Sequence, residues 1–550
     1  MRFLKLLMKN SRPIVALIIV LGIFDSLLHG GLLFFISSAI SDKSLFMPKR
    51  YNWMLFVAII VSSLVCSKIF QMYMIRLTNN ILYDLEVDIL SKLRYSSFER
   101  FESFGNEVVY NAINDAKVLA HVPQVFMNAF NSIVIVLCCI GYLLWISWVG
   151  CLCLLLLMTG LLIFYLMRNR NIERELNEKR NLEDQYYRYL DDMLKGFREL
   201  KMNSNRHDRL FHHFLIRNRL TGRDISIASY IKYLDNELTG SYSWYIIIGV
   251  ILFVLPGLVH LTGEKTSGFL IAVLYLIGPI TLLISLMPTY TVVKIALERL
   301  DVFEDKVGAT LDGKRKPCMP MPDVPFESIR FEAVSFLYAS REFGQPFLLE
   351  PIDLLIRRGE IVFITGGNGS GKSTFGYLLT GLYRPGAGSI YLNGSEVTED
   401  NHSSYRDLIA AIFSDNYLFS ENYDEFDLAN SNLQLLEFIE LLQMTHILKP
   451  DKGKTPLDKN LSRGQQKRLA LIYALLENKQ IIFMDEWAAE QDPRFRAYFY
   501  GTVLQKLKEM GKTVILITHD DDYYTYASRV IKFNYGRIVA DIHNETFQPV

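Results

Sequence analysis

The feature that most constrains this chain is a set of long apolar segments, all of which lie within its first 300 residues. A helix needs about 20 predominantly apolar residues to cross the hydrocarbon core of a bilayer. The apolar stretch that follows the basic N-terminus is too long for the core of a signal peptide. We therefore predict a membrane domain with six spans, at 13–40, 52–75, 124–146, 148–168, 241–261 and 267–291.

The connections between these segments predict which side of the membrane the rest of the chain faces. Short links alternate with two long ones, 76–123 and 169–240, and the second is rich in Arg and Lys. By the positive-inside rule, both long connections, the N-terminus and the C-terminal half lie in the cytoplasm. The basic residues of 41–51 oppose this orientation but are outweighed by those of 169–240.

Both long connections have helical spacing and few breaks, so we expect the membrane helices to continue into the cytoplasm. Short amphipathic stretches lie at the tips of these connections, at 96–105 and 199–214. From the pattern alone, each stretch could either dock on a soluble domain or form a solvated helical hairpin.

Polar groups inside a membrane span are costly and usually face protein or water. Asp25 and His29 are one helical turn apart near the middle of the first span, and Lys68 lies in the second. Asp25 and His29 are candidates for a polar cavity that meets a substrate. The alternatives are a structural Asp–His pair or an interhelical hydrogen bond, and for Lys68 a side chain that reaches the interface.

Charge and cysteine content exclude some classes of function. Lys and Arg total 58, as do Asp and Glu, so the net charge gives no indication of nucleic acid as a partner. Five of the six cysteines lie in apolar segments, which argues against a secreted disulfide framework. No zinc-binding spacing is present in the sequence.

A polar, proline-bearing stretch at 304–326 marks a boundary between domains. After it, a phosphate-binding loop follows the apolar strand EIVFIT and opens a helix, which is the setting that the motif G-x-x-x-x-G-K-[ST] requires. Its backbone N–H groups would hold phosphates, Lys372 would reach the β- and γ-phosphates, and Ser373 would ligate Mg²⁺. The loop consists of Gly366, Gly367, Asn368, Gly369, Ser370, Gly371, Lys372 and Ser373.

Further signals for phosphate chemistry follow in order. The sequence LSRGQ places Ser462, Gly464 and Gln465 at the start of a helix, where an anion is favoured. The apolar run IIFM then ends in Asp485, expected to orient Mg²⁺, and Glu486, placed to polarise the attacking water. His519 ends another strand, where a contact with the γ-phosphate is expected.

In this order behind six spans, these motifs resemble an ABC transporter half-molecule of the exporter type. The resemblance implies a fold in which a six-helix, all-α transmembrane domain is fused to an α/β P-loop NTPase domain, with ATP and Mg²⁺ as cofactors. It implies that Tyr338 stacks on adenine, that the Walker A loop extends to Thr374, and that 96–105 and 199–214 are coupling helices. Because one chain carries one P-loop and one signature, it also implies a homodimer with two composite sites. The sequence near Asp492 resembles the D-loop.

The chain departs from the common family pattern at three places. Arg463 replaces the first glycine of LSGGQ, AEQD replaces SALD in the D-loop, and Ser414 lies where the family has the glutamine of the Q-loop. A serine is too short to copy the reach of a glutamine, although Asp415 or a water could substitute. The combination of motifs resembles exporters of cyclic peptides and siderophore peptides, including those that expel microcins and lipopeptides of the syringomycin kind.

We therefore predict an ATP-driven exporter of a peptide-like metabolite in the bacterial inner membrane, surrounded by lipid and with its ATPase domain in the cytoplasm. The expected domains are 1–303, a linker at 304–326, and 327–550. About 12 residues precede the first span, so no N-terminal peptidase domain is expected. The alternatives are a lipid flippase or multidrug pump, a metal–siderophore importer on the same scaffold, and a membrane-tethered regulatory ATPase.

Overall fold

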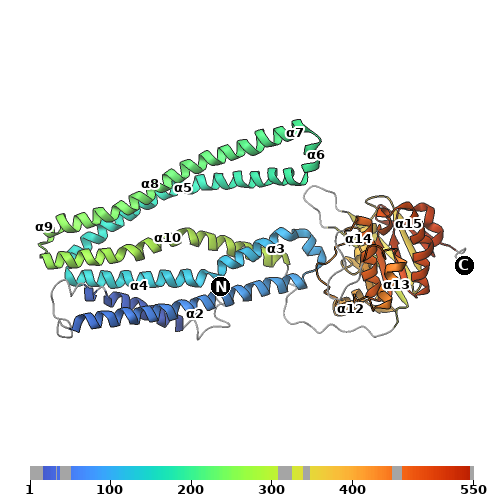
Figure 1. Cartoon of the computed structure of the whole chain (residues 1–550), viewed down its shortest axis with the longest axis horizontal. Helices are drawn as coiled ribbons and strands as arrows, with labels where there is room; N and C mark the ends of the chain where they lie inside the picture. The colour runs from blue at the N-terminus through green and yellow to red at the C-terminus, as the bar shows by residue number, and fades with distance from the viewer. Residues whose placement is uncertain are drawn as a thin grey trace. The chain divides into compact units, whose positions relative to one another are not determined.

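The computed structural model describes residues 17–32, 34–36, 51–307, 325–338, 347–448 and 461–544. The chain divides into two compact units (Figure 1). The helical unit comprises Met1–Ser91 and Val108–Phe303, and the α/β unit comprises Lys92–Glu107 and Glu304–Val550. Most of the predicted linker lies outside the described residues.

The helical unit is built from long helices, as the apolar periodicity predicts. The first is Leu17–Ile36. The next are α2 (Asn52–Tyr95), α3 (Phe98–Ala120), α4 (Val122–Ile146), α5 (Trp148–Lys195), α8 (Arg217–Gly249), α9 (Leu255–Val259) and α10 (Gly263–Val307). A π-helical turn, η3 (Val250–Val254), joins α8 to α9. The structure thus confirms that the two long connections continue the membrane helices.

Five helical stretches among the described residues are long and apolar enough to cross a membrane. They are Leu17–Ile36, Asn52–Tyr95, Val108–Ile146, Ser204–Val259 and Gly263–Leu286. The remaining predicted span, 148–168, starts at Trp148 as expected, and its apolar part is the shorter stretch Trp148–Phe164. Ser147 forms the tight link before it, because its hydroxyl accepts a hydrogen bond from the Gly150 amide and caps α5.

Helices α5 and α8 form an arm that separates from α10 towards its tip (Figure 1). The tip consists of α6 (Phe197–Lys201), α7 (Ser204–Asp208) and the π-helical turn η2 (Arg209–Ile216). Asn203 starts α7, since its side chain accepts a hydrogen bond from the Arg206 amide at 3.0 Å. The predicted amphipathic stretch 199–214 therefore lies at the end of the arm.

The α/β unit contains two sheets. A four-stranded antiparallel sheet has the order β2 (Leu348–Arg357), β1 (Ser328–Leu337), β4 (Ala387–Leu392), β5 (Ser395–Glu396). A six-stranded sheet has the order β10 (Arg537–His543), β9 (Arg529–Asn534), β3 (Ile361–Gly366), β8 (Thr513–Ile517), β7 (Ile481–Asp485), β6 (Ile409–Ile412). The helices of this unit are α11 (Lys372–Leu379), α12 (His402–Arg406), α13 (Leu433–Leu441), α14 (Arg463–Leu476), α15 (Pro493–Tyr498) and α16 (Leu504–Glu509).

Strands β3, β7 and β8 form the buried centre of the six-stranded sheet. Every residue of β7 and β8 is buried, and so are the first five of β3, because a parallel sheet is covered on both faces. The three strands run parallel, so their carboxyl ends meet at one edge. This topology brings the P-loop, Asp485 and His519 to the same edge.

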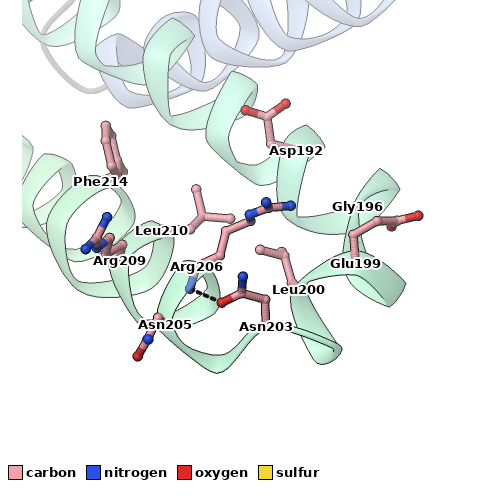
Figure 2. Close-up of a pocket in the computed structure, with 10 residues that line it drawn as sticks. All are labelled: Asp192, Gly196, Glu199, Leu200, Asn203, Asn205, Arg206, Arg209, Leu210 and Phe214. Atoms are coloured by element: carbon pink, nitrogen blue, oxygen red, sulfur yellow. Dashed lines mark hydrogen bonds between the residues drawn. The ribbon is translucent and has the colours of Figure 1, made fainter.

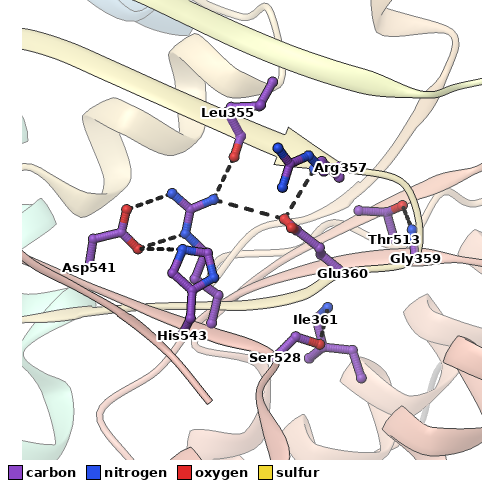
Figure 3. A network of polar contacts seen from close by, with 10 residues as sticks. Leu355, Arg357, Gly359, Glu360, Ile361, Thr513, Ser528, Asp541 and His543 are labelled. Atoms are coloured by element: carbon purple, nitrogen blue, oxygen red, sulfur yellow. Dashed lines mark hydrogen bonds and ion pairs between the residues drawn. The ribbon is translucent and has the colours of Figure 1, made fainter. Parts of the chain in front are cut away.

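Arg529 of β9 ties the two sheets together through hydrogen bonds to Leu355 and Asp541, which are labelled in Figure 3. Its guanidinium donates to both carboxylate oxygens of Asp541, at 2.6 and 2.5 Å, and to the Leu355 carbonyl at 2.5 Å. The carboxylate of Glu360 lies 4.0 Å away. The hydrogen bonds from Arg529 hold the pKa of Asp541 below its ordinary value.

Candidate active site

The P-loop forms a turn that only glycine accommodates at two points. Gly369 and Gly371 have φ of 73° and 102°, in the left-handed region that side chains rarely adopt. A Cβ on Gly366 would lie 2.2 Å from the Phe533 carbonyl oxygen, so this glycine also permits close packing of β3 on β9. The loop ends at Lys372, which is the first residue of α11. The free N–H groups at the start of this helix therefore face the loop.

Lys372 is held within the loop that it follows. Its Nζ donates to the carbonyl oxygens of Gly366 and Gly367, both at 2.9 Å, and the residue is buried. Burial lowers the pKa of Lys372, while the nearby charges of Glu486 and Asp485 oppose that shift. The ammonium group is therefore in place to exchange carbonyl oxygens for phosphate oxygens.

Asp485 ends β7 as a buried carboxylate. Burial and then the charge of Glu486 raise its pKa to about 6, and Lys467 and Lys372 oppose the shift. A cation beside this carboxylate would relieve the cost of its charge. The donor set fits Mg²⁺, which prefers one or two protein oxygens supplemented by phosphate and water oxygens. Asp485 and the hydroxyl of Ser373 are the residues that would hold the ion.

Glu486 and His519 face each other beyond the ends of β7 and β8. His519 Nε2 lies 3.2 Å from Glu486 Oε1, and both side chains are partly exposed. Glu486 adopts a left-handed backbone conformation with φ of 46°. Two hydrogen bonds hold this conformation: the Glu486 N–H donates to the Ile517 carbonyl, and the Glu486 carbonyl accepts from Lys467 Nζ. This strained geometry turns the carboxylate out of the sheet towards solvent.

The signature sequence begins α14 with a capping box. The Ser462 hydroxyl accepts from the Gln465 amide at 3.3 Å, and the Gln465 side chain accepts from the Ser462 amide at 2.9 Å. Arg463 is exposed and lies 3.8 Å from Glu490. The structure thus places the predicted Ser462 and Gln465 together at one helix start.

The unusual D-loop contacts the signature within the same chain. Gln491 is buried, and its amide donates to the Gly464 carbonyl at 3.0 Å and accepts from Arg468 Nε at 2.8 Å. A Cβ on Gly464 would lie 2.8 Å from the Glu490 carbonyl, so glycine is needed for this approach. Asp492 caps α15 through the Phe495 amide. The sequence shows only that AEQD is unusual, because the partner of Gln491 lies 27 residues away along the chain.

Trp487, the other unusual residue of this stretch, is fully buried. Its indole N–H donates to the Lys467 carbonyl at 2.8 Å, and its ring packs against Phe499 at a centroid distance of 4.4 Å. Trp487 is therefore a core residue that contacts both α14 and the helix that follows the D-loop.

Tyr338, the predicted adenine-stacking residue, lies at the end of β1 in a cluster of aromatic rings. Its hydroxyl donates to the Tyr383 hydroxyl at 3.1 Å, and its ring meets those of Phe336, Phe347 and Tyr383. The ring is half-buried, so one part of it stays accessible. The contact with Tyr383 was not foreseen from the sequence.

Ser414, at the position of the Q-loop glutamine, is exposed just after β6. The neighbouring Asp415 lies near enough to Asp485 to raise its pKa, although less than burial does. Of the two residues, Asp415 is thus the one with an electrostatic connection to the site.

The predicted segment 96–105 docks on the α/β unit, which confirms that alternative for its described residues. Phe98 packs against Tyr377 and Tyr383, with centroid distances of 5.6 and 6.2 Å. The Tyr383 hydroxyl donates to the carboxylate of Glu102.

The polar residues of the first span form one cluster with α2. Ser67 donates to the Asp25 carboxylate at 2.5 Å, Ser63 lies 3.5 Å from His29 Nδ1, and that nitrogen lies 3.7 Å from the carboxylate. The Tyr275 hydroxyl of α10 donates to the His29 carbonyl at 2.9 Å. The interhelical hydrogen bond weighed above is thus present, and it does not exclude a substrate contact, because the His29 side chain is 37% exposed.

A hollow of about 650 Å³ lies at the tip of the arm (Figure 2). Its lining mixes the carboxylates of Asp192 and Glu199, the guanidinium groups of Arg206 and Arg209, and the ring of Phe214. It lies in the helical unit and contains none of the predicted nucleotide-binding residues.

Comparisons with known proteins agree with this arrangement. Residues 349–489 match the family model described as ABC transporter. The chain is 33% identical over 425 residues to ATP-binding protein SyrD of Pseudomonas syringae pv. syringae, covering 73% of this chain and 72% of that one. It is 32% identical over 211 residues to the sublancin-168-processing and transport ATP-binding protein SunT of Bacillus subtilis, covering 36% of this chain and 29% of SunT.

The fold resembles that of a bacterial Atm1-family ABC exporter solved with ATP bound. The TM-score is 0.69 at 18% identity, and the match covers 98% of this chain and 95% of that one. The predicted fold class is confirmed: an N-terminal helical transmembrane domain precedes a C-terminal α/β ATPase domain. The chain therefore belongs to the ABC transporter family, as an exporter-type half-transporter that couples ATP hydrolysis to transport across a membrane.

Proposed function

We propose that two copies of this chain export a peptide-like metabolite, such as a cyclic peptide, a microcin or a siderophore peptide, across the bacterial inner membrane. The observation that carries this proposal is the departure from common motifs, AEQD and LSRGQ, in an otherwise complete set of catalytic residues. Similarity to SunT, whose name assigns it the processing and transport of sublancin-168, supports the same class of cargo.

In this proposal the nucleotide lies between two copies. The P-loop of one copy, Gly366 to Thr374, binds the phosphates, and Tyr338 stacks on adenine. Ser462, Gly464 and Gln465 of the other copy close the site. Because each chain has one P-loop and one signature, each copy completes the site of its partner. We assign residues 1–303 to the transmembrane domain, 304–326 to the linker and 327–550 to the ATPase domain.

Hydrolysis would use the residues that meet at the sheet edge. Lys372 neutralises the β- and γ-phosphates, Glu486 accepts the proton of the attacking water, and His519 contacts the γ-phosphate and orients Glu486. Ser373 and Asp485 would hold Mg²⁺, which would supply charge compensation for the phosphates. The 3.2 Å contact between Glu486 and His519 supports their joint action.

The cargo site would include Asp25 and His29. A carboxylate and an imidazole within a span are costly to bury in lipid, so both favour a polar cargo over a hydrocarbon chain. Their contacts with Ser67 and Ser63 hold the two side chains in place. To be driven by ATP, the cargo must bind differently in the inward and outward states.

The test is ATP-dependent uptake into inverted membrane vesicles, with a panel of cyclic peptides, siderophore peptides and a fluorescent phospholipid. Accumulation of a peptide that requires ATP and is lost in the Glu486→Gln variant supports the proposal. Translocation of the phospholipid alone favours a flippase. Uptake of a metal–siderophore complex only into right-side-out vesicles favours an importer. Hydrolysis that no compound stimulates favours a regulatory ATPase.

A further inference from the structure

A chain of hydrogen bonds connects the predicted adenine-stacking residue to the docked segment Lys92–Glu107. The Tyr338 hydroxyl donates to the Tyr383 hydroxyl, and the Tyr383 hydroxyl donates to the Glu102 carboxylate. A carboxylate only accepts hydrogen bonds, so it fixes the direction of both donors. The two contacts join residues 45 and 281 positions apart in the chain.

Tyr383 is suited to transmit a change because its ring cannot move independently of its neighbours. The residue is 1% exposed and its ring stacks on Phe336 at 4.9 Å. Tyr377 packs on it from another direction, also at 4.9 Å. With the ring held on these sides, Glu102 fixes the direction of the Tyr383 O–H bond, and the same oxygen accepts the hydrogen bond from Tyr338.

We propose that Glu102 is a positioning residue for nucleotide binding, which acts through the Tyr383 hydroxyl to orient the ring of Tyr338 for adenine. The inference rests on the adenine-stacking role proposed above for Tyr338. Glu102 belongs to the connection between the second and third predicted spans, so this relay couples that connection to the adenine side of the site. Coupling of this kind is reciprocal: nucleotide binding must also favour the docked position of the segment.

The relay is independent of the position at which the family carries its Q-loop glutamine. Ser414 takes part in neither hydrogen bond, and it is exposed. The relay reaches the site at Tyr338, the residue proposed to contact adenine, whereas Ser414 follows β6, which is separated from the P-loop strand by β8 and β7. A chain with serine at 414 thus retains a polar connection between the docked segment and the nucleotide site.

The test compares three conservative variants of the full chain in lipid nanodiscs: Glu102→Gln, Tyr383→Phe and Tyr338→Phe. Each removes a hydroxyl or a charge and keeps the size of the side chain. Since the net contribution of one such bond is modest, the KM for ATP should rise about fivefold in each, with kcat within twofold of the wild type. The double variant Glu102→Gln/Tyr383→Phe should show no rise beyond that of Tyr383→Phe, because the weaker acceptor in Glu102→Gln acts only through the hydroxyl that Tyr383→Phe removes.

The matched control is Tyr405→Phe, which removes another buried tyrosine hydroxyl from the same core. That hydroxyl donates to the Leu379 carbonyl at 2.5 Å, so its loss should lower the thermal unfolding temperature without changing the KM. Should Tyr383→Phe fail to fold, the partly exposed Glu102→Gln still decides the matter. An unchanged KM in Glu102→Gln, or additive effects in the double variant, overturns the relay.

A fourth variant separates failure of the relay from failure of the proposed site. Tyr338→Ala removes the stacking ring and should raise the KM at least tenfold. If Tyr338→Ala has no effect, the adenine role is wrong, and the relay falls with it. If Tyr338→Ala raises the KM but Glu102→Gln does not, the site stands and only the relay is overturned.

Discussion

The Gln491 amide and the Gly464 carbonyl are joined by a 3.0 Å hydrogen bond that fastens the D-loop to the signature loop. Gln491→Leu removes this bond and leaves the Gly464 carbonyl and Arg468 Nε without their buried partner, which costs about 1–3 kcal/mol. We expect the thermal unfolding temperature to fall by several degrees. In the proposed dimer the signature loop closes the nucleotide site of the other copy, so a loosened loop should also raise the KM for ATP. The exposed Glu490→Gln is the control, and equal unfolding temperatures for the two variants would contradict this role.

Glu486→Gln should bind ATP and stall before hydrolysis. The amide keeps the size of the side chain and its contact with His519 but cannot accept the proton of water, so kcat should fall by about 10²- to 10⁴-fold. ATP-dependent dimer closure, measured by distance between labels on the two ATPase domains, should persist without turnover. Near-normal hydrolysis in this variant would remove Glu486 as the base.

Asp25→Ala should weaken the stimulation of ATP hydrolysis by cargo and leave basal hydrolysis largely intact. The Asp25 carboxylate lies in the helical unit, where it accepts a hydrogen bond from Ser67. Its loss should therefore leave the residues that hydrolyse ATP unchanged. Ser67→Ala is the matched variant: it removes the interhelical hydrogen bond but keeps the carboxylate. Loss of stimulation only in Asp25→Ala supports a cargo contact, whereas equal loss in both assigns the pair to helix packing.

Because of His402, we expect the folded ATPase unit to lose stability in acid. Burial, with Arg406 and Arg384 adding to it and Glu399 opposing, lowers the pKa of His402 to about 4. Its pKa in the unfolded chain is about 6.5, so the unfolded state binds a proton that the folded state excludes. Stability is therefore complete above about pH 6.5 and falls between about pH 6.5 and 4, by up to about 3 kcal/mol.

His402→Gln should flatten this pH dependence when thermal unfolding is followed from pH 4 to 8. The exposed His446→Gln serves as control, and it should retain the slope of the wild type. If His402→Gln keeps the same slope, the histidine is not the source of the acid sensitivity.

Arg529→Met should destabilise the ATPase unit by about 2 kcal/mol, because it removes charged hydrogen bonds from the Asp541 carboxylate and the Leu355 carbonyl. Arg537→Met provides the comparison, since Arg537 pairs with Glu350 at the surface, where such pairs contribute at most about 1 kcal/mol. Equal unfolding temperatures for the two variants would refute the connecting role of Arg529.

The sequence alone determined the local elements of this protein. The apolar segments predict the long helices, since length and hydropathy suffice to define a span. The glycines of the P-loop, the apolar strand before it and the helix after it predict a phosphate-binding loop, because each acts on its neighbours in the chain. The apolar runs before them also predict that Asp485, Glu486 and His519 lie at strand ends, and the order of the motifs indicates the family.

Tertiary structure decided which distant residues meet. The sequence identifies Gln491 only as part of an altered D-loop, whereas the structure buries it against Gly464. The sequence predicts only that the ring of Tyr338 stacks on adenine. The structure shows in addition that its hydroxyl is joined to Glu102 by two consecutive hydrogen bonds through Tyr383. Periodicity and motif spacing report the environment of neighbours within a few residues, whereas these contacts depend on how strands and helices pack after the chain has folded back on itself.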